Sequence, residues 1–142
     1  MEESAGIPIQ NSGEVNDDLR SQIDIVTWYF GEEIDRVAMH HPVRRSELIE
    51  ALATIQLYGL LLRDEDALEI SGVVHESSHE EVLVLKKGFW TRIEQRGIIP
   101  RSQIIAVRDI HESIVNTLRT DQDTEGGDSF VMVTADPDAI RL

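Results

Sequence analysis

Apolar residues return every three or four positions along most of this chain, and that spacing restricts its fold more than any other feature of the sequence. The longest stripe lies in residues 19–37 and consists of Leu19, Ile23, Val26, Phe30, Ile34 and Val37. Side chains at this spacing share one face of an α-helix. The stripe therefore predicts an amphipathic helix that begins after Asn16, a good N-cap residue, and ends before Pro42.

Three further segments repeat the spacing and predict three more helices. The second is expected from Ser46 to about residue 64, the third over residues 78–96, and the fourth after Pro100. The inward face of the second helix carries Leu48, Leu52, Ile55, Gly59 and Leu62. The inward face of the third carries Val82, Leu85, Phe89 and Ile93. The inward face of the fourth carries Ile104, Val107, Ile110, Ile114 and Leu118.

The two ends of the chain are expected to lie outside this helical domain, which spans residues 17–119. Residues 1–16 mix Gly, Pro, Ser, Asn and Glu without periodicity and predict a flexible arm. Residues 120–142 predict an acidic linker followed by a short β-strand, and residues 67–76 fit either a short helix or a strand. The expected fold class is therefore mainly α: a four-helix bundle-like domain with a mobile polar N-terminal arm and a short C-terminal β-strand on an acidic linker.

The composition limits the chemistry that this chain can perform. Among 142 residues there is no cysteine, which excludes disulfides, thiolate metal sites and cysteine nucleophiles. The 27 acidic residues outnumber the 13 basic ones, and the net charge of −14 repels nucleic acid and anionic lipid. Only Lys86 and Lys87 are lysines, a balance that resembles the proteins of salt-loving archaea. No apolar run is long enough to span a bilayer, so we expect a cytoplasmic protein or one built into an intracellularly assembled particle.

One motif suggests catalysis. Residues 75–79 read His-Glu-Ser-Ser-His, which resembles the HExxH signature of the zincin metalloproteases. The resemblance implies that His75 and His79 bind zinc and that Glu76 acts as the general base. Under the same resemblance, the third ligand would be one of three residues: Glu94, His111 or Glu112.

The residues after the motif favour a different interpretation. Glu80 and Glu81 stand where the zincin pattern has uncharged or apolar residues. With Ser77 and Ser78 they form two overlapping capping boxes ahead of an apolar run, and a capping serine would leave His75 outside the helix. We therefore predict no metal site and no cofactor, and keep a zinc protease as the second alternative.

A basic segment supports the first alternative, a DNA-binding regulator. Residues 86–119 hold seven bases against three acids, whereas residues 17–85 hold fifteen acids against five arginines. The candidate nucleic-acid patch consists of Lys86, Lys87, Arg92, Arg96 and Arg101. Residues 42–52 (PVRRSELIEAL) also resemble the second helix of winged helix-turn-helix proteins, but apolar residues follow in place of a polar recognition helix.

The preferred hypothesis is a non-enzymatic assembly or adaptor protein that acts through protein–protein contacts. A lone strand cannot pair within a helical body. The strand at 129–134 must therefore pair with residues 68–74, with the N-terminal arm or with another molecule. The expected interface residues are Trp90, Phe130, Val131 and Val133. A homo-oligomer or hetero-complex is expected, by architectural analogy with ring and connector subunits such as those of viral particles.

Overall fold

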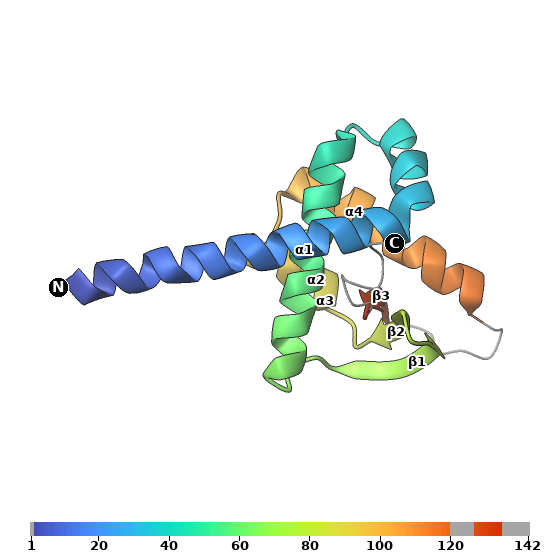
Figure 1. Ribbon diagram of the computed structural model, residues 1–142. Helices are drawn as coiled ribbons and strands as arrows, with labels where there is room; N and C mark the ends of the chain where they lie inside the picture. The colour runs from blue at the N-terminus through green and yellow to red at the C-terminus, as the bar shows by residue number, and fades with distance from the viewer. Residues whose placement is uncertain (1, 120–126, 135–142) are drawn as a thin grey trace.

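The structure is a computed structural model that describes the backbone of residues 2–119 and 127–134, with side chains from Asp18 onward. Its elements follow in the order α1 (Glu2–His40), α2 (Arg45–Asp64), β1 (Ile70–Glu76), β2 (Glu80–Leu85), α3 (Phe89–Arg96), α4 (Arg101–Leu118) and β3 (Asp128–Val133) (Figure 1). The strands form an antiparallel sheet in the order β1-β2-β3. The fold is therefore mixed α+β, and the expected four-helix bundle with one detached strand is wrong.

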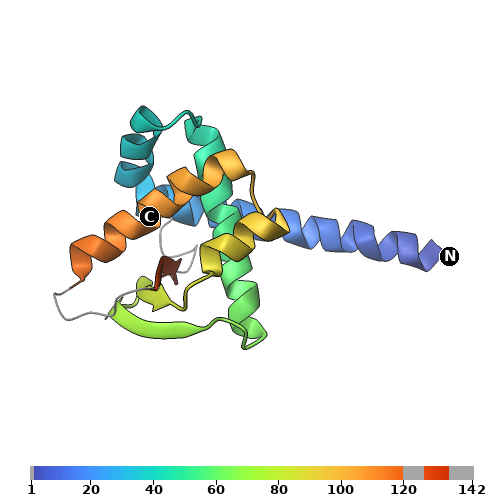
Figure 2. The same cartoon turned by 180° about the vertical axis from the view of Figure 1, so that it is seen from behind.

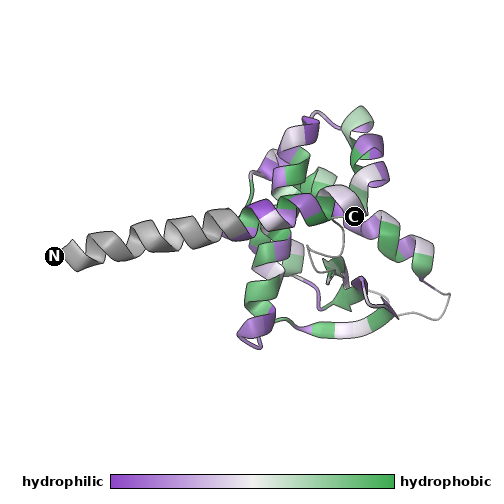
Figure 3. Ribbon diagram, in the orientation of Figure 1, coloured by the Kyte–Doolittle hydropathy of each residue, from purple (hydrophilic) through white to green (hydrophobic). Residues whose placement is uncertain are grey.

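The predicted apolar faces of α1, α2 and α4 are buried over most of their length, but Leu118, predicted to face inward at the end of α4, is 41% exposed. Val26, Phe30 and Ile34 of α1 are buried, as are Leu52 of α2 and Ile110 of α4. These faces meet in one core that also takes in Val82–Leu85 of β2 and Phe130–Val133 of β3, and both strands are largely green in Figure 3. The structure thus keeps the predicted helical faces but packs them against a sheet.

Helix α1 is longer than predicted and is not straight. Its backbone is helical from Glu2, so it includes the residues 2–16 that we expected as an arm. Figures 1 and 2 both show α1 changing direction before its last turns. Thr27 donates its hydroxyl to the carbonyl of Ile23 at 2.7 Å, a back-bond that bends helices, and Gly31 follows one turn later.

The helix predicted over residues 78–96 is wrong, because this segment forms a strand and a shorter helix. Val82 to Leu85 form a continuous apolar run with two β-branched residues, and all four are buried within β2. Gly88 then adopts a φ of 108°, which separates β2 from α3. The predicted capping serine is used in a turn instead: the Oγ of Ser77 accepts the N–H groups of His79 and Glu80 and closes the β1–β2 hairpin.

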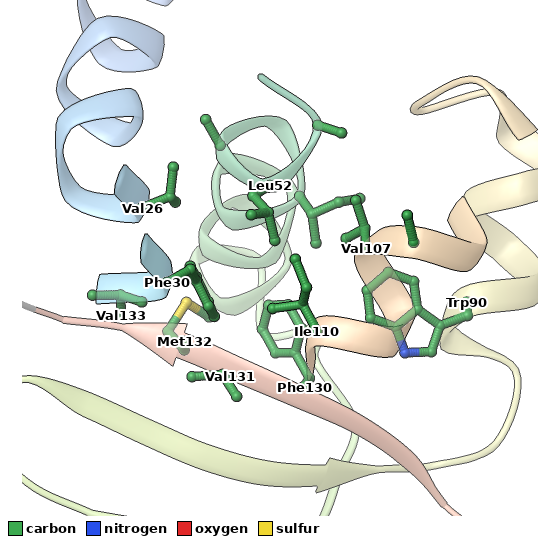
Figure 4. Close-up of a cluster of buried hydrophobic side chains, with 14 of the residues drawn as sticks. Val26, Phe30, Leu52, Trp90, Val107, Ile110, Phe130, Val131, Met132 and Val133 are labelled. Atoms are coloured by element: carbon green, nitrogen blue, oxygen red, sulfur yellow. The ribbon is translucent and has the colours of Figure 1, made fainter. Parts of the chain in front are cut away.

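The C-terminal strand pairs with the segment that we expected to be a helix. β3 lies along β2, with Leu83 opposite Phe130 and Glu80 opposite Val133. Its six residues are all buried, and Figure 4 shows the last four of them, Phe130 to Val133, in the core. The sequence analysis proposed residues 68–74, the N-terminal arm or another molecule as the partner of this strand, and β3 pairs with none of them. The true partner, β2, was not considered because its residues had been assigned to the third helix. The predicted acidic linker falls largely on residues 120–126, outside the described residues.

Side chains from the helices form hydrogen bonds with the backbone groups on the edge of β3 that faces away from β2. In an antiparallel pair alternate residues turn their N–H and C=O groups away from the partner strand. On that outer edge, Gln56 of α2 donates to the carbonyl of Val131 at 2.6 Å and accepts the N–H of Val133 at 2.9 Å. Trp90 donates its indole N–H to the carbonyl of Ser129 at 3.0 Å. β3 is the last strand of the sheet, but helical side chains supply on its outer edge the hydrogen bonds that a fourth strand would supply.

Candidate functional site

The HExxH residues lie on a hairpin rather than on a helix. His75 is near the end of β1 and His79 is in the turn before β2, so the two imidazoles are not one helical turn apart. Both are exposed, and the His79 ring packs edge-on against Trp28 of α1 with centroids 5.6 Å apart. Among the side chains that the structure describes, no three His, Asp or Glu residues lie close enough to hold a metal ion.

The three proposed third ligands are also in other environments. Glu94 pairs with Arg101 at 3.0 Å, and Glu112 pairs with Arg108 at 2.9 Å. His111 is buried in the core, beside Phe130. The structure therefore does not bring the residues implied by the zincin resemblance together.

The predicted basic patch is on the surface but is mixed with acids. Lys86, Lys87, Arg92, Arg96 and Arg101 are all exposed, before and along α3 and at the start of α4. Glu69 lies 3.9 Å from both Lys86 and Arg92, and Glu94 pairs with Arg101. These carboxylates reduce the positive field that a DNA backbone would meet. In a winged helix-turn-helix protein, a recognition helix follows the helix that residues 42–52 resemble. Here α2, which contains most of those residues, is followed by strand β1 instead.

The four expected interface residues are in the core of this chain. Trp90, Phe130, Val131 and Val133 are all nearly or fully buried, and all four appear in the cluster of Figure 4. Phe130 packs against Phe89 with ring centroids 5.0 Å apart, and its tip occupies the space beside Gly59. In this fold Trp90, Phe130 and Val131 leave no surface for a partner, and Val133 is 3% exposed at the edge of the core.

His111 is a buried titratable group that fixes β3. Its Nδ1 accepts the N–H of Val131 at 2.9 Å, and its ring stacks on Phe130 at a centroid distance of 5.2 Å. Because Nδ1 is the acceptor, the neutral ring carries its proton on Nε2, and that N–H has no hydrogen-bond partner within the described structure. Burial lowers the pKa of His111 from its ordinary 6.5 to about 3.

A groove lies in the corner between α1, α2 and the end of β3. Its volume is about 800 Å³. Each helix contributes a stripe of four residues at helical spacing. The stripe on α1 is Asp18, Ser21, Gln22 and Ile25, and the stripe on α2 is Leu57, Leu60, Leu61 and Asp64. Val133 and Thr134 complete the lining.

The groove is apolar inside and acidic at its rim. Ile25 is buried at the inner end, whereas Leu61 is 52% exposed and turns an apolar side chain to solvent. Asp18 and Asp64 are exposed at the outer ends of the two stripes. A leucine-lined groove with two carboxylates at its rim has the chemistry to bind an apolar segment that carries positive charge.

Gln22 gives the groove an unused hydrogen-bond acceptor. The residue is only 9% exposed, and its Oε1 is buried with no hydrogen-bond partner in the described part of the chain. A buried polar atom without a partner costs about 1–3 kcal/mol, and natural proteins contain few of them. An occupant of the groove could donate an N–H to this oxygen, and so remove that cost, once the Gln22 side chain had rotated toward the groove.

Comparison with known proteins gives one match. The model of the family described as "Domain of unknown function (DUF8048)" matches residues 23–140, most of the chain. The chain belongs to the DUF8048 family. No curated protein and no solved structure matches it. The DUF8048 match covers all of α2 but begins at Ile23, so of the α1 residues that line the groove it includes Ile25 alone. No helix among the described residues is long and apolar enough to cross a membrane.

Sequence reasoning missed the groove of this DUF8048 domain. Leu60 and Leu61 belong to the run LLL at 60–62, of which only Leu62 was assigned to the inward face. Three consecutive leucines cannot all face one side of a helix, so the run itself signalled an apolar residue at the surface. Gln22 interrupts the apolar positions of α1 and was a second signal.

Proposed function

We propose that this domain is a non-enzymatic adaptor or assembly module that binds an apolar segment of a partner protein in the groove between α1 and α2. The observation that carries this function is the groove itself, whose lining includes both a solvent-exposed leucine and a glutamine with an unpartnered buried amide oxygen. Two helix stripes at an angle to each other are a common receptor for an amphipathic segment.

The charge of the groove specifies the partner. Asp18 and Asp64 at the rim attract a segment whose apolar face is flanked by arginine or lysine, and they repel an acidic one. The net charge of −14 adds long-range attraction for such a basic segment. The occupant is therefore an amphipathic, positively charged segment of another protein.

The free edge of β1 is a weaker candidate for binding a partner. Ile70 and Val73 are exposed there, which would suit the addition of a strand. However, the pairing of β1 with β2 is irregular at two places, between Ile70 and Gly72 and between Val73 and His75. Bulges of this kind distort an edge and hinder regular pairing with another strand.

A designed peptide tests the groove directly. The probe is a helical peptide of about 18 residues, or five turns, with leucine on one face and lysine on the other. The control peptide has glutamate in place of lysine. Binding is measured at about 1 M salt, where the screening length of about 3 Å suppresses non-specific attraction. We expect the basic peptide to bind at that salt concentration and the acidic peptide not to bind.

Two matched variants identify the binding surface. Leu61→Glu removes apolar contact from the groove, whereas Ile105→Glu adds the same charge at a residue on α4 that is 67% exposed and outside the groove. We expect Leu61→Glu to weaken binding of the basic peptide by about tenfold or more, since burial of a leucine contributes about 1.5–3 kcal/mol. Ile105→Glu should leave the affinity unchanged. Equal effects of the two variants, or tighter binding by both, would overturn the proposal.

A further inference from the structure

A second pocket lies on α1, outside the groove, and it combines aromatic rings with carboxylates. Its volume is about 430 Å³. Its lining comes from one stretch of α1 and one residue of α4: Trp28, Tyr29, Gly31, Glu32, Glu33 and Ile114. None of these six residues lines the groove, so binding in this pocket does not depend on the proposed function.

The spacing along α1 pairs each aromatic ring of the pocket with a carboxylate. Trp28 and Glu32 are four positions apart, as are Tyr29 and Glu33. Residues four positions apart lie on the same face of a helix, about one turn from each other. Gly31 adds no side chain to the lining, and a Cβ there would have nothing within 4 Å. A cation in the pocket would therefore meet aromatic and carboxylate groups at the same time.

Both aromatic side chains are held in position by the β1–β2 hairpin. The Trp28 ring contacts the His79 ring edge-on at a centroid distance of 5.6 Å, and Tyr29 donates its hydroxyl to the Oε1 of Glu80 at 3.1 Å. Trp28 nevertheless remains 46% exposed, whereas Trp90 is 1% exposed in the core. A ring that is already fixed and still open to solvent loses little freedom when a ligand stacks on it.

The two carboxylates of the pocket differ in their partners. Glu33 is engaged, because the guanidinium group of Arg36 donates to its Oε1 from Nη2 at 2.7 Å and from Nε at 2.9 Å. Glu32 is exposed and forms no ion pair with a base among the described side chains. A ligand that brings its own positive charge would therefore pair with Glu32 without displacing Arg36.

We propose that this pocket binds the guanidinium group of an arginine in a partner polypeptide. A guanidinium group is planar and weakly hydrated, stacks on aromatic faces and donates parallel hydrogen bonds to carboxylates. The ammonium group of lysine is compact and strongly hydrated, so it gains less from an aromatic wall. The net charge of −14 adds long-range attraction for either cation, and the rings of Trp28 and Tyr29 select between them.

The composition of the lining favours an arginine within a polypeptide over the free amino acid. Free arginine carries an α-carboxylate as well as its guanidinium group. None of the six described residues that line the pocket is basic, and Glu32 and Glu33 would repel that carboxylate. An arginine inside a chain has no α-carboxylate, so only its guanidinium group meets the charges of the pocket.

Blocked amino acids separate the effect of charge from the effect of shape. The probes are the N-acetyl amides of arginine, lysine and citrulline, of which citrulline has the shape of arginine without its charge. Each is titrated into the whole chain, isotope-labelled for NMR, and the indole N–H signals of Trp28 and Trp90, the two tryptophans, are followed. Salt at about 1 M shortens the screening length to about 3 Å and suppresses non-specific attraction.

We expect the arginine probe to shift the Trp28 signal saturably, to leave the Trp90 signal in place and to bind several-fold more tightly than the lysine probe. The citrulline probe should not bind. Equal affinities for the arginine and lysine probes, or no saturable shift with the arginine probe, would overturn the proposal. Tighter binding of free arginine than of its blocked form would overturn the assignment to a polypeptide.

Matched variants locate the site on the chain. Glu32→Gln removes the carboxylate that has no base beside it, whereas Glu50→Gln removes the same charge at an exposed position of α2 outside both the pocket and the groove. We expect Glu32→Gln to weaken binding of the arginine probe several-fold and Glu50→Gln to leave it unchanged. Trp28→Leu, followed through the backbone amide signal of Gly31, should also weaken binding because the cation–π contact is lost. Equal effects of the two glutamate variants, or full affinity in Trp28→Leu, would overturn the proposal.

Discussion

His111 holds β3 through a hydrogen bond in which the imidazole Nδ1 accepts the backbone N–H of Val131 at 2.9 Å. A protonated imidazole has only donors, so protonation of His111 would turn this hydrogen bond into a repulsive contact between two N–H groups. Burial opposes the charge as well, and the pKa of His111 is lowered to about 3. The stability of the fold is thereby linked to pH through one side chain.

The first prediction concerns acid. Between pH 6.5 and about 3 the unfolded chain binds a proton at His111 and the folded chain does not, so the free energy of unfolding falls as the pH falls. The expected slope from this group is about 1.4 kcal/mol per pH unit, and it disappears above pH 6.5. Urea unfolding of the wild type and of His111→Gln from pH 4 to pH 8 measures it. Glutamine keeps a hydrogen-bond acceptor but does not titrate, so the free energy of unfolding of the variant should change less with pH than that of the wild type. The same pH dependence in both proteins would contradict the prediction.

The second prediction concerns the amide that replaces a neighbouring strand. Gln56→Leu preserves the size of the side chain but leaves the carbonyl of Val131 and the N–H of Val133 buried without partners. Each unsatisfied group costs about 1–3 kcal/mol, so we expect a loss of several kcal/mol in the free energy of unfolding. Gln95→Leu, at an exposed position of α3, should change stability by less than about 0.5 kcal/mol. Similar unfolding midpoints for the two variants would show that the Gln56 contacts contribute little.

Two glycines form a matched pair for the third prediction. A Cβ at Gly59 would lie 2.6 Å from the Cζ of Phe130, whereas a Cβ at Gly31 would have nothing within 4 Å. Gly59→Ala should therefore destabilise the fold by about 1–3 kcal/mol through overpacking. Gly31→Ala should stabilise it by about 0.5–1 kcal/mol, because alanine is the better helix former and Gly31 has no positive φ. Thermal unfolding of both variants should shift in opposite directions; a shift in the same direction would contradict this packing.

The fourth prediction concerns Gln22. Gln22→Leu removes a buried oxygen that lacks a partner, so the isolated protein should become more stable by about 1 kcal/mol. The same change removes the acceptor for an occupant of the groove and should weaken binding of the basic peptide. Calorimetry and a binding titration on the same variant measure the two effects. A variant that binds the peptide as tightly as the wild type would show that the Gln22 oxygen does not contact it.

The sequence predicted three of the four described helices because each has an apolar stripe longer than any strand. It failed at β2, where VLVL fits the end of a helical face as well as a buried strand, and periodicity cannot separate the two over four residues. That single error also removed the partner of β3 and made Phe130 and Val131 look like interface residues. The groove was missed for a different reason: it depends on the angle between α1 and α2, which no local pattern encodes.

The position of β3 has a consequence for biosynthesis. Gln56 and His111 are synthesised before Val131, whose backbone is their hydrogen-bonding partner. Until Val131 leaves the ribosome, the side chains of Gln56 and His111 have no partner in β3 and cannot be buried without cost. The core around Phe130 therefore closes only once the strand at 128–133 has emerged, and a chain that stops at Arg119 lacks the strand that pairs with β2 and packs against the helices. Such a product exposes the unpaired edge of β2, and it would be recognised by chaperones and proteases as incomplete.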